Sequence, residues 1–333
     1  MGKNFVCIAA TLWLFVTALA GTPKGYVIST KNAETVLTES VLKERIEYLS
    51  HPQCSGRGTG TPGSTWAIGW IGQQFQHQGL EPVSGSYFQG FRTPAGKTGH
   101  NVIGLLPGRD GGKTGEYILV TAHLDHLGIL SGKLYPGADS NASGVAAMLS
   151  LSDMFTHLKK LGRSYGKGIL FVALDGKEQG LSGSGELWRR LQGGLLSDPV
   201  SGKTIRPKDI SLVVNIDQVG CTLSPLKSGR KDYLIMLSDA ATGRRDLLTA
   251  VNRSQNINLE LSFDYYGSKD FTRLFYRTVS DQKVFLEHGI PAVMFTSGIT
   301  LNNNKPYDDL GSIDFPVLRA RVLLMFHYLS RIA

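Results

Sequence analysis

Cysteine is scarce in this chain of 333 residues, which contains only Cys7, Cys54 and Cys221. No two of them form a CxxC pair, and this excludes a cysteine-based zinc site and a dithiol redox centre. Cys7 lies in an apolar N-terminal segment. Cys54 and Cys221 leave two alternatives open, either one disulfide in an oxidising compartment or two buried free thiols.

Long apolar runs are also absent after residue 20, so nothing beyond it predicts a membrane span. Residues 5–20, FVCIAATLWLFVTALA, form one apolar run that ends in small residues. We predict a signal peptide over residues 1–20 with cleavage near Ala20, and a secreted or periplasmic protein without stable membrane insertion. The alternative is an uncleaved N-terminal anchor, although the run is shorter than the roughly 20 residues that span a bilayer.

Basic charge is not concentrated in any segment, although the net charge is +8. Lysines and arginines are scattered, without interleaved aromatics or a recognition-helix motif, which argues against nucleic-acid binding. Repeats, low-complexity tracts and clear linkers are missing too, and nothing indicates an oligomeric state. The sequence therefore predicts a single domain over residues 21–333, with a core at about 100–333 and an N-terminal helical segment at about 36–80 packed on it.

Apolar runs alternate with helical patterns through most of the chain. Strands are expected at HNVIGLLPG, EYILVTAHLDH, KGILFVALDG, ISLVVNID, DYLIMLSD and GIPAVMFTSG, and helices at 38–50, 144–161 and 315–332. Nearly continuous apolar strands separated by helices are typical of a sheet that is covered on both faces. We therefore predict a three-layer α/β fold, with a twisted, mostly parallel (mixed) central sheet and helices on both faces.

Polar side chains follow the expected strands at the points where the strands end. His123 and Asp125 end one strand, Asp139 lies in PGADSNASG before a helix, Glu178 follows a further strand and Asp217 ends another. The carboxyl ends of parallel strands meet at one edge of the sheet, where ligands bind. One imidazole and several carboxylates at this edge predict a cation site, with zinc as the first choice because imidazole suits it.

Each of these residues also has an ordinary structural explanation. A strand-end carboxylate commonly faces water or caps the next helix, and Asp139 is placed to cap a helix that begins near Ala142. His126 is an alternative ligand, but its spacing from His123 makes it a neighbour of the site instead. Polar groups at four successive strand ends favour a shared site over four independent caps.

These segments together resemble the co-catalytic zinc aminopeptidase family typified by bacterial leucine aminopeptidases, which also includes the glutaminyl cyclases. The resemblance covers about residues 101–314 and is carried by HLDHLG, GADSNASG, KEQGLSGS, NIDQVG and GIPAVMFTSG in this order. It implies a phosphorylase/hydrolase-like zinc-exopeptidase fold and a peptide substrate, without indicating which residues bind the substrate.

The resemblance also implies a role for each polar residue. His123, Asp139 and Asp217 would hold one zinc ion. Asp139 would bridge to a second ion that Glu178 also binds, and Asp125 would orient His123 by accepting its other ring N–H. In the family, a carboxylate immediately before the residue equivalent to Glu178 removes the proton of the attacking water.

Three positions depart from the family pattern. Lys177 stands where the general base is expected, Asn304 where a final histidine ligand is expected, and Ser140 where a second aspartate follows the bridging one. An amide is a poor zinc ligand, so the second ion loses much of its site. We therefore expect at most one zinc ion, in the site formed by His123, Asp139 and Asp217.

Lys177 admits three explanations. Beside a metal its amine could lose its proton and serve as the base. It could instead stay protonated next to Glu178 and Asp139 and partly replace the missing cation, which we favour, or it could point to solvent. In each case hydrolysis lacks the usual carboxylate base, which contributes about 10²- to 10⁴-fold in rate.

Two functions are consistent with these residues. The first is a secreted zinc-dependent aminopeptidase-like hydrolase that acts on peptide N-termini, with reduced activity or one metal ion. The second is a catalytically silent relative that binds peptide or another ligand in the former active-site cleft. A glutaminyl cyclase-like transferase is a weaker alternative, because the final histidine and the acidic base are both missing.

Overall fold

The computed structural model describes residues 28–333, apart from 110–114, 224–225, 227, 240–241, 243 and 266. The signal peptide predicted over residues 1–20 lies outside the described residues. Within the part of the chain that is described, no helix is both long and apolar enough to cross a membrane.

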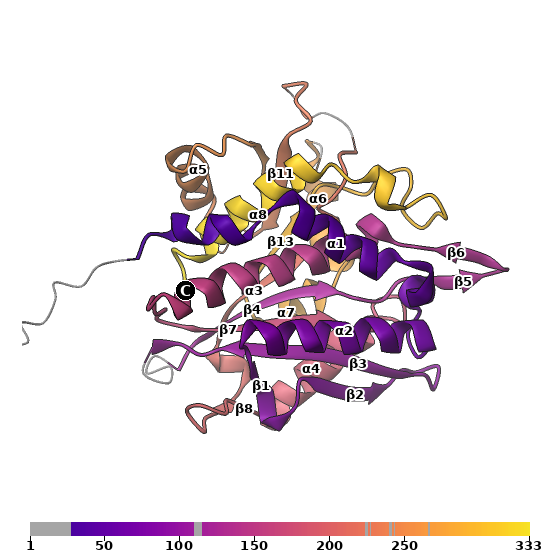
Figure 1. Cartoon of the computed structure of the whole chain (residues 1–333), viewed down its shortest axis with the longest axis horizontal. Coiled ribbons are helices and arrows are strands. Elements are labelled where there is room, and N and C mark those ends of the chain that lie inside the picture. Colours follow the sequence, from indigo (N-terminus) through magenta and orange to yellow (C-terminus); the bar gives the residue numbers. More distant parts are fainter. Residues whose placement is uncertain are drawn as a thin grey trace, which may run out of the picture.

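A nine-stranded mixed sheet forms the centre of the molecule (Figure 1). Its order is β1–β3–β7–β4–β10–β13–β11–β12, and β2 pairs with β3. The four central strands β7, β4, β10 and β13 are mutually parallel, whereas β3 and β11 on either side are antiparallel to them. The strands of this sheet are β1 (Glu81–Pro82), β2 (Phe88–Arg92), β3 (Thr98–Leu106), β4 (Tyr117–His123), β7 (Gly168–Leu174), β10 (Ile210–Ile216), β11 (Tyr233–Ser238), β12 (Glu260–Ser262) and β13 (Ala292–Thr296). Two small hairpins add β5 (Gly128–Leu130), β6 (Lys133–Tyr135), β8 (Leu196–Ser197) and β9 (Thr204–Ile205).

Helices cover both faces of this sheet (Figure 1). They are α1 (Glu39–Ser50), α2 (Pro62–Gln78), α3 (Gly144–Lys160), α4 (Ser182–Gly193), α5 (Arg245–Ser254), α6 (Lys269–Thr278), α7 (Gln282–Glu287) and α8 (Phe315–Leu329). Buried side chains of α1, α2, α3, α5 and α8 belong to one core, and those of α4 and α7 belong to a second core with other strand residues. The predicted three-layer mixed α/β architecture is therefore confirmed.

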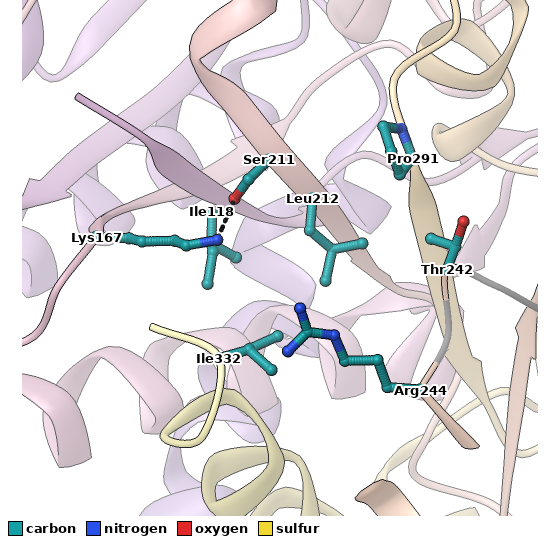
Figure 2. A pocket seen from close by; sticks show the side chains of 8 residues that line it. All are labelled: Ile118, Lys167, Ser211, Leu212, Thr242, Arg244, Pro291 and Ile332. Atoms are coloured by element: carbon teal, nitrogen blue, oxygen red, sulfur yellow. Dashed lines mark hydrogen bonds between the residues drawn. The ribbon is translucent and has the colours of Figure 1, made fainter. Parts of the chain in front are cut away.

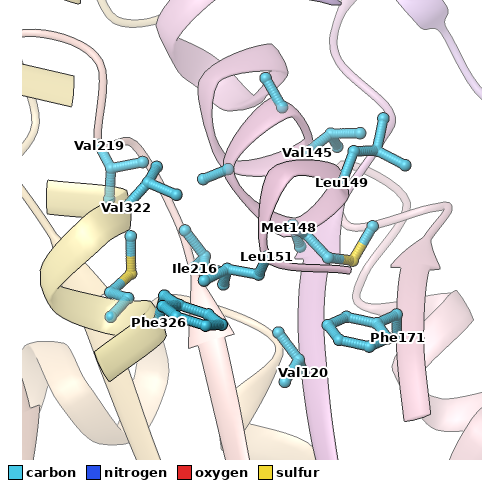
Figure 3. Close-up of a cluster of buried hydrophobic side chains, with 14 of the residues drawn as sticks. Val120, Val145, Met148, Leu149, Leu151, Phe171, Ile216, Val219, Val322 and Phe326 are labelled. Atoms are coloured by element: carbon cyan, nitrogen blue, oxygen red, sulfur yellow. The ribbon is translucent and has the colours of Figure 1, made fainter. Parts of the chain in front are cut away.

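The larger core is built between the sheet and the helices α3 and α8. Figure 3 shows Met148 and Leu151 of α3 near Val120 and Phe171 of the sheet, with Phe326 of α8 beside them. All five side chains are almost fully buried. Burial of each large apolar side chain contributes roughly 1.5–3 kcal/mol, so this packing holds the central strands and their carboxyl ends in place.

Both remaining cysteines are free and buried, which is one of the two alternatives that the sequence left open. Cys54 Sγ lies 3.3 Å from the carbonyl oxygen of Tyr48. Cys221 Sγ lies 3.1 Å from the carbonyl oxygen of Ser312. Each thiol therefore donates a weak hydrogen bond to backbone in its own part of the structure.

Arg57 is a fully buried cation that ties three segments together. Its guanidinium donates to the carbonyl oxygens of Leu124 (2.7 Å), Leu49 (2.6 Å), Pro136 (2.7 Å) and Gly137 (2.8 Å). These carbonyls belong to the end of α1, the segment after β4 and the segment before Asp139. Arg57 therefore holds two loops that carry predicted site residues.

Replacement of Arg57 by methionine is expected to lower the free energy of unfolding by about 3 kcal/mol or more, because three buried carbonyls and one partly buried carbonyl lose their donor. Urea denaturation measures the effect. Arg92→Met is the matched control, since Arg92 is exposed and its guanidinium donates, within the described residues, only to the Gly96 carbonyl. Its effect is expected to stay within about 0.5 kcal/mol. Equal losses in the two variants would contradict this role of Arg57.

Candidate active site

His123 ends the central strand β4, and its imidazole is fully buried. Nδ1 lies 3.0 Å from the backbone oxygen of Asp125, so we assign the proton to Nδ1 as the donor. Nε2 then carries the lone pair, and it lies 3.1 Å from Nζ of Lys177. His123 is therefore a neutral imidazole that accepts a hydrogen bond from the lysine ammonium.

The ammonium of Lys177 lies among three side chains that the sequence assigned to a metal site. Besides His123, Nζ is 3.5 Å from Oδ2 of Asp217 and 3.8 Å from Oε1 of Glu178. Only 14% of the lysine side chain is exposed. Burial lowers the pKa of Lys177, but the negative charges of Asp217 and Glu178 outweigh this effect and raise the pKa. Lys177 is therefore a cation held by Asp217 and Glu178, whereas the favoured explanation named Glu178 and Asp139.

Asp217 is positioned by a chain of buried hydroxyl and amide groups behind it. Ser280 Oγ donates to Asp217 Oδ2 at 2.6 Å, and Asn215 Nδ2 donates to Ser280 Oγ at 2.9 Å. Thr121 Oγ1 donates to Asn215 Oδ1 at 2.8 Å. Burial alone would raise the pKa of Asp217, yet the nearby Lys177 ammonium lowers it far below the usual range. The carboxylate is therefore ionised and fixed in orientation.

Sequence reasoning missed this supporting chain. Asn215 is a polar residue inside the otherwise apolar strand segment ISLVVNI, and that departure from the apolar pattern was the available signal. Ser280 had no comparable signal, because it comes from a segment about sixty residues away that only the fold brings close.

Asp125 contacts His123 through its backbone carbonyl, while its carboxylate Oδ1 is 3.8 Å from His123 Nδ1. The carboxylate instead accepts the backbone N–H groups of Lys177 and Glu178, each at 3.0 Å. Asp125 thus fixes the backbone from which the lysine and the glutamate project.

Asp139 makes its side-chain hydrogen bonds to groups outside this cluster. Its Oδ1 accepts hydrogen bonds from Ser143 Oγ (2.9 Å), from the Gly220 N–H (2.8 Å) and from the Cys221 N–H (3.2 Å). Burial raises its pKa. Among the described residues, no hydrogen bond or ion pair joins the Asp139 carboxylate to His123, and its Oδ2 has no hydrogen-bond partner.

Ser140, not Asp139, lies next to the wall of the cleft. Its Oγ is 3.5 Å from Nε2 of Gln218, and that amide also donates to Asn303 Oδ1 at 3.1 Å. Gln218, Asn303 and the predicted position Asn304 all line the cleft. A neutral hydroxyl and three neutral amides therefore stand along this wall.

The cleft has a volume of about 360 Å³ and contains Lys177, Glu178 and Asp217. Part of its lining is apolar. The apolar lining residues are Leu181, Phe275, Val279, Met294 and Ile299.

His126 is buried beside the cluster, and neither ring nitrogen has a hydrogen-bond partner among the described residues. Burial, with the neighbouring cations Arg57 and Lys177, lowers the pKa of His126 to about 2. The ring is therefore neutral.

The arrangement does not fit a zinc ion. Zinc ligands lie about 2.0–2.2 Å from the metal, and the Lys177 ammonium lies where an ion between His123 and Asp217 would have to bind. In the described parts of the chain, no three His, Cys, Asp or Glu side chains are grouped so that they could hold a metal ion.

A different pocket lies at the amino-terminal side of the central strands and holds none of the predicted site residues (Figure 2). Its volume is about 240 Å³. Figure 2 shows Lys167 donating to Ser211 Oγ at one end, a bond of 3.1 Å, and Arg244 near Ile332. Lys167 is also paired with Glu116, so its charge is already compensated.

Comparison with known sequences identifies two matches. The profile of peptidase family M28 matches residues 101–329. The alkaline phosphatase isozyme conversion protein of Escherichia coli strain K12 is 33% identical over 178 residues, which cover 49% of this chain and 47% of that protein. The match thus spans about half the length of that relative.

Solved structures share the fold at low sequence identity. A zinc aminopeptidase from Bacillus subtilis has a TM-score of 0.65 and 13% identity, with 89% of this chain and 95% of that chain covered. The glutaminyl cyclase of Porphyromonas gingivalis has a TM-score of 0.64 and 16% identity, with 90% and 99% covered. These structural similarities confirm the fold class, and the profile match confirms the family resemblance.

Proposed function

Because the chain belongs to peptidase family M28, a family of hydrolases, we propose that it is a member in which Lys177 replaces the metal ion, and that its cleft binds peptide segments without hydrolysing them. The observation that carries this proposal is the position of the Lys177 ammonium, 3.1 Å from His123 Nε2 and 3.5 Å from Asp217 Oδ2.

Space and charge both oppose a metal ion beside this lysine. The ammonium takes the lone pair of His123 that a zinc ion would need. An ammonium about 3 Å from a divalent ion also costs roughly 10 kcal/mol at an effective dielectric of about 20. The lysine supplies the positive charge that His123 and Asp217 face, so the site is electrostatically complete without a metal.

The groups needed for hydrolysis are missing as well. Lys177 is protonated and cannot accept a proton from water, and Asn304 supplies an amide in place of the expected histidine. Ser140 places a hydroxyl beside the cleft wall. Loss of the general base alone lowers a rate by about 10²- to 10⁴-fold.

The cleft itself is retained, and its walls suit a peptide. Its lining includes the amides of Gln218 and Asn303, which can pair with a peptide backbone, as well as apolar side chains. A concave site with an apolar wall and few polar groups is typical of ligand binding. Membership of a peptidase family makes a peptide the first choice of ligand.

A second candidate is a zinc-dependent aminopeptidase that holds one ion. It is favoured by the gathering of His123, Asp217 and Glu178 around one point. The flexible stem of Lys177 would have to swing away to free these ligands. Secretion of a single domain over residues 21–333 after cleavage near Ala20 is part of both proposals.

Purified protein is expected to contain no bound zinc and to release no product from a panel of aminoacyl chromogenic substrates, even in excess zinc. Elemental analysis and the absorbance assay measure this. His123→Ala is the control, since a residual contaminant activity would be the same in this variant. Zinc at about one ion per chain, with turnover abolished in His123→Ala, would establish the second candidate instead.

Peptides with an apolar N-terminal residue are expected to bind the cleft and to be recovered uncleaved. Isothermal titration calorimetry and mass spectrometry measure binding and integrity. Thr278→Trp places an indole in the cleft from an exposed position at the end of α6, and it is expected to weaken binding by tenfold or more, roughly the effect of losing one anchoring side chain. Undiminished binding by this variant would exclude the cleft as the binding site.

A further inference from the structure

An aromatic groove lies on α1 and α2 and contains none of the residues of the cleft. Tyr48 of α1 stacks on Trp70 of α2, with ring centroids 4.4 Å apart and planes inclined by 15°. Trp66, one helical turn before Trp70, is 54% exposed. A cavity of about 670 Å³ runs along these rings. The rest of its lining consists of glycine, proline, threonine and glutamine residues, so no charged side chain faces it.

Gly69 keeps the floor of this groove open. It lies between Trp66 and Trp70 in the interior of α2, and within the described structure no atom lies within 4 Å of the place where its Cβ would be. A glycine inside a helix costs about 0.5–1 kcal/mol relative to alanine, and packing does not require one here. The missing side chain at Gly69 leaves a gap between the indoles of Trp66 and Trp70 that a ligand group can enter.

The groove has an acidic end. Tyr48 also borders a second hollow of about 350 Å³, whose lining includes Glu44, Glu47 and His51. Glu44 and Glu47 are three residues apart on α1, both are exposed, and no ion pair within the described residues engages either of them. On a chain with a net charge of +8, this end is complementary to a basic group.

We propose that this groove binds an extended, proline-rich polypeptide segment that carries lysine or arginine at one end. Polyproline II segments dock in aromatic-lined grooves, because their rings fit between flat side chains and little conformational entropy is lost on binding. The gap above Gly69 would accept a proline ring between Trp66 and Trp70. Glu44 and Glu47 would then pair with the basic end of the segment. A neutral oligosaccharide can also stack on exposed indoles, but it has no group that pairs with these glutamates.

Fluorescence anisotropy with a labelled polyproline peptide that ends in arginines tests the proposal on the intact chain. Saturable binding is expected, with Trp66→Ala weaker by roughly thirtyfold, as for an aromatic anchor. Gly69→Leu puts a side chain into the groove at a position where the added Cβ meets no described atom within 4 Å. It is expected to weaken binding at least tenfold, roughly 1.4 kcal/mol, while a thermal melt shows the fold intact.

Gly185→Leu is the matched control, because Gly185 also lies within a helix, α4, with no atom within 4 Å of its Cβ position in the described structure. This variant is expected to bind like the wild type. The double variant Glu44→Lys, Glu47→Lys is expected to bind a polyproline peptide that ends in glutamates more tightly than the one that ends in arginines. A purely structural role of the two glutamates would not reverse this charge preference.

Three results would overturn the proposal. The first is unchanged affinity in Gly69→Leu. The second is binding of a cello-oligosaccharide with no binding of the peptide. The third is self-association of the chain that Gly69→Leu abolishes, again with no peptide binding. None of these outcomes depends on whether the cleft holds zinc or hydrolyses peptides.

Discussion

Replacement of Lys177 by methionine is expected to lower the free energy of unfolding by about 3–5 kcal/mol at neutral pH. Methionine keeps most of the side-chain volume but removes the ammonium that pairs with Asp217 and donates to His123. Asp217 then remains as a buried, ionised carboxylate without its cation, and removal of one partner of a buried pair costs about this much. Urea denaturation with an unchanged m-value measures the loss.

Lys167→Met is the control for this experiment. Lys167 pairs with Glu116 at 2.9 Å, but their side chains are 25% and 48% exposed, so water compensates for the loss. The expected effect is below about 1 kcal/mol. A loss of the same small size in Lys177→Met would show that Asp217 does not depend on the lysine, and the ammonium could then not be called a replacement for a metal.

Replacement of Lys177 by glutamate is expected to create a zinc site where the wild type has none. The variant removes the competing cation and places a carboxylate beside His123, Asp217 and Glu178. Zinc at saturating concentration should raise the melting temperature of the variant by several degrees, because a ligand that binds only the folded state stabilises it by RT ln(1 + [L]/Kd). The wild type should show no shift.

The ligand identity of this new site is tested by a second change. The double variant Lys177→Glu, His123→Ala is expected to lose most of the zinc-dependent shift, because imidazole is the only nitrogen donor in the cluster. A zinc-dependent shift of equal size in the wild type would mean that Lys177 moves aside for the ion, as the aminopeptidase candidate requires. Hydrolysis is expected only when Asn304→His is added to Lys177→Glu.

The gathering of His123, Glu178 and Asp217 was predictable from the sequence. Each residue ends or follows a strongly apolar strand, and β4, β7 and β10 are adjacent and parallel. Because the carboxyl ends of neighbouring parallel strands meet at one edge, order along the chain was sufficient to bring these side chains together.

At Asp139, a sequence motif did not predict the direction in which the side chain points. The turn over residues 138–143 has non-helical backbone angles at Ser140 and Asn141, so consecutive side chains leave it in different directions. The Asp139 carboxylate is bonded to Ser143, Gly220 and Cys221, whereas Ser140 lies against the cleft wall. A motif assigns residue types to a loop, but backbone angles decide which of two neighbours reaches the site.

The segment from about 240 to 290 was the least predictable part of the fold. Its helices α5, α6 and α7 are short and carry many charged residues, and their position depends on packing against distant strands. Yet this segment supplies Ser280, which orients Asp217, and Phe275, which lines the cleft. Contacts between residues that are far apart in sequence leave no local periodic signal.

By itself, the sequence determined the α/β class and the edge of the sheet where the polar side chains gather, because apolar periodicity and the order of strand ends are local properties. Its motifs carried the resemblance to the family that the profile match confirms. Only the tertiary structure decided which cation His123 and Asp217 face. An ammonium and a metal ion compete for the same position, and the position of the ammonium is set by the packing of whole strands and by Asp125, which fixes the backbone of Lys177.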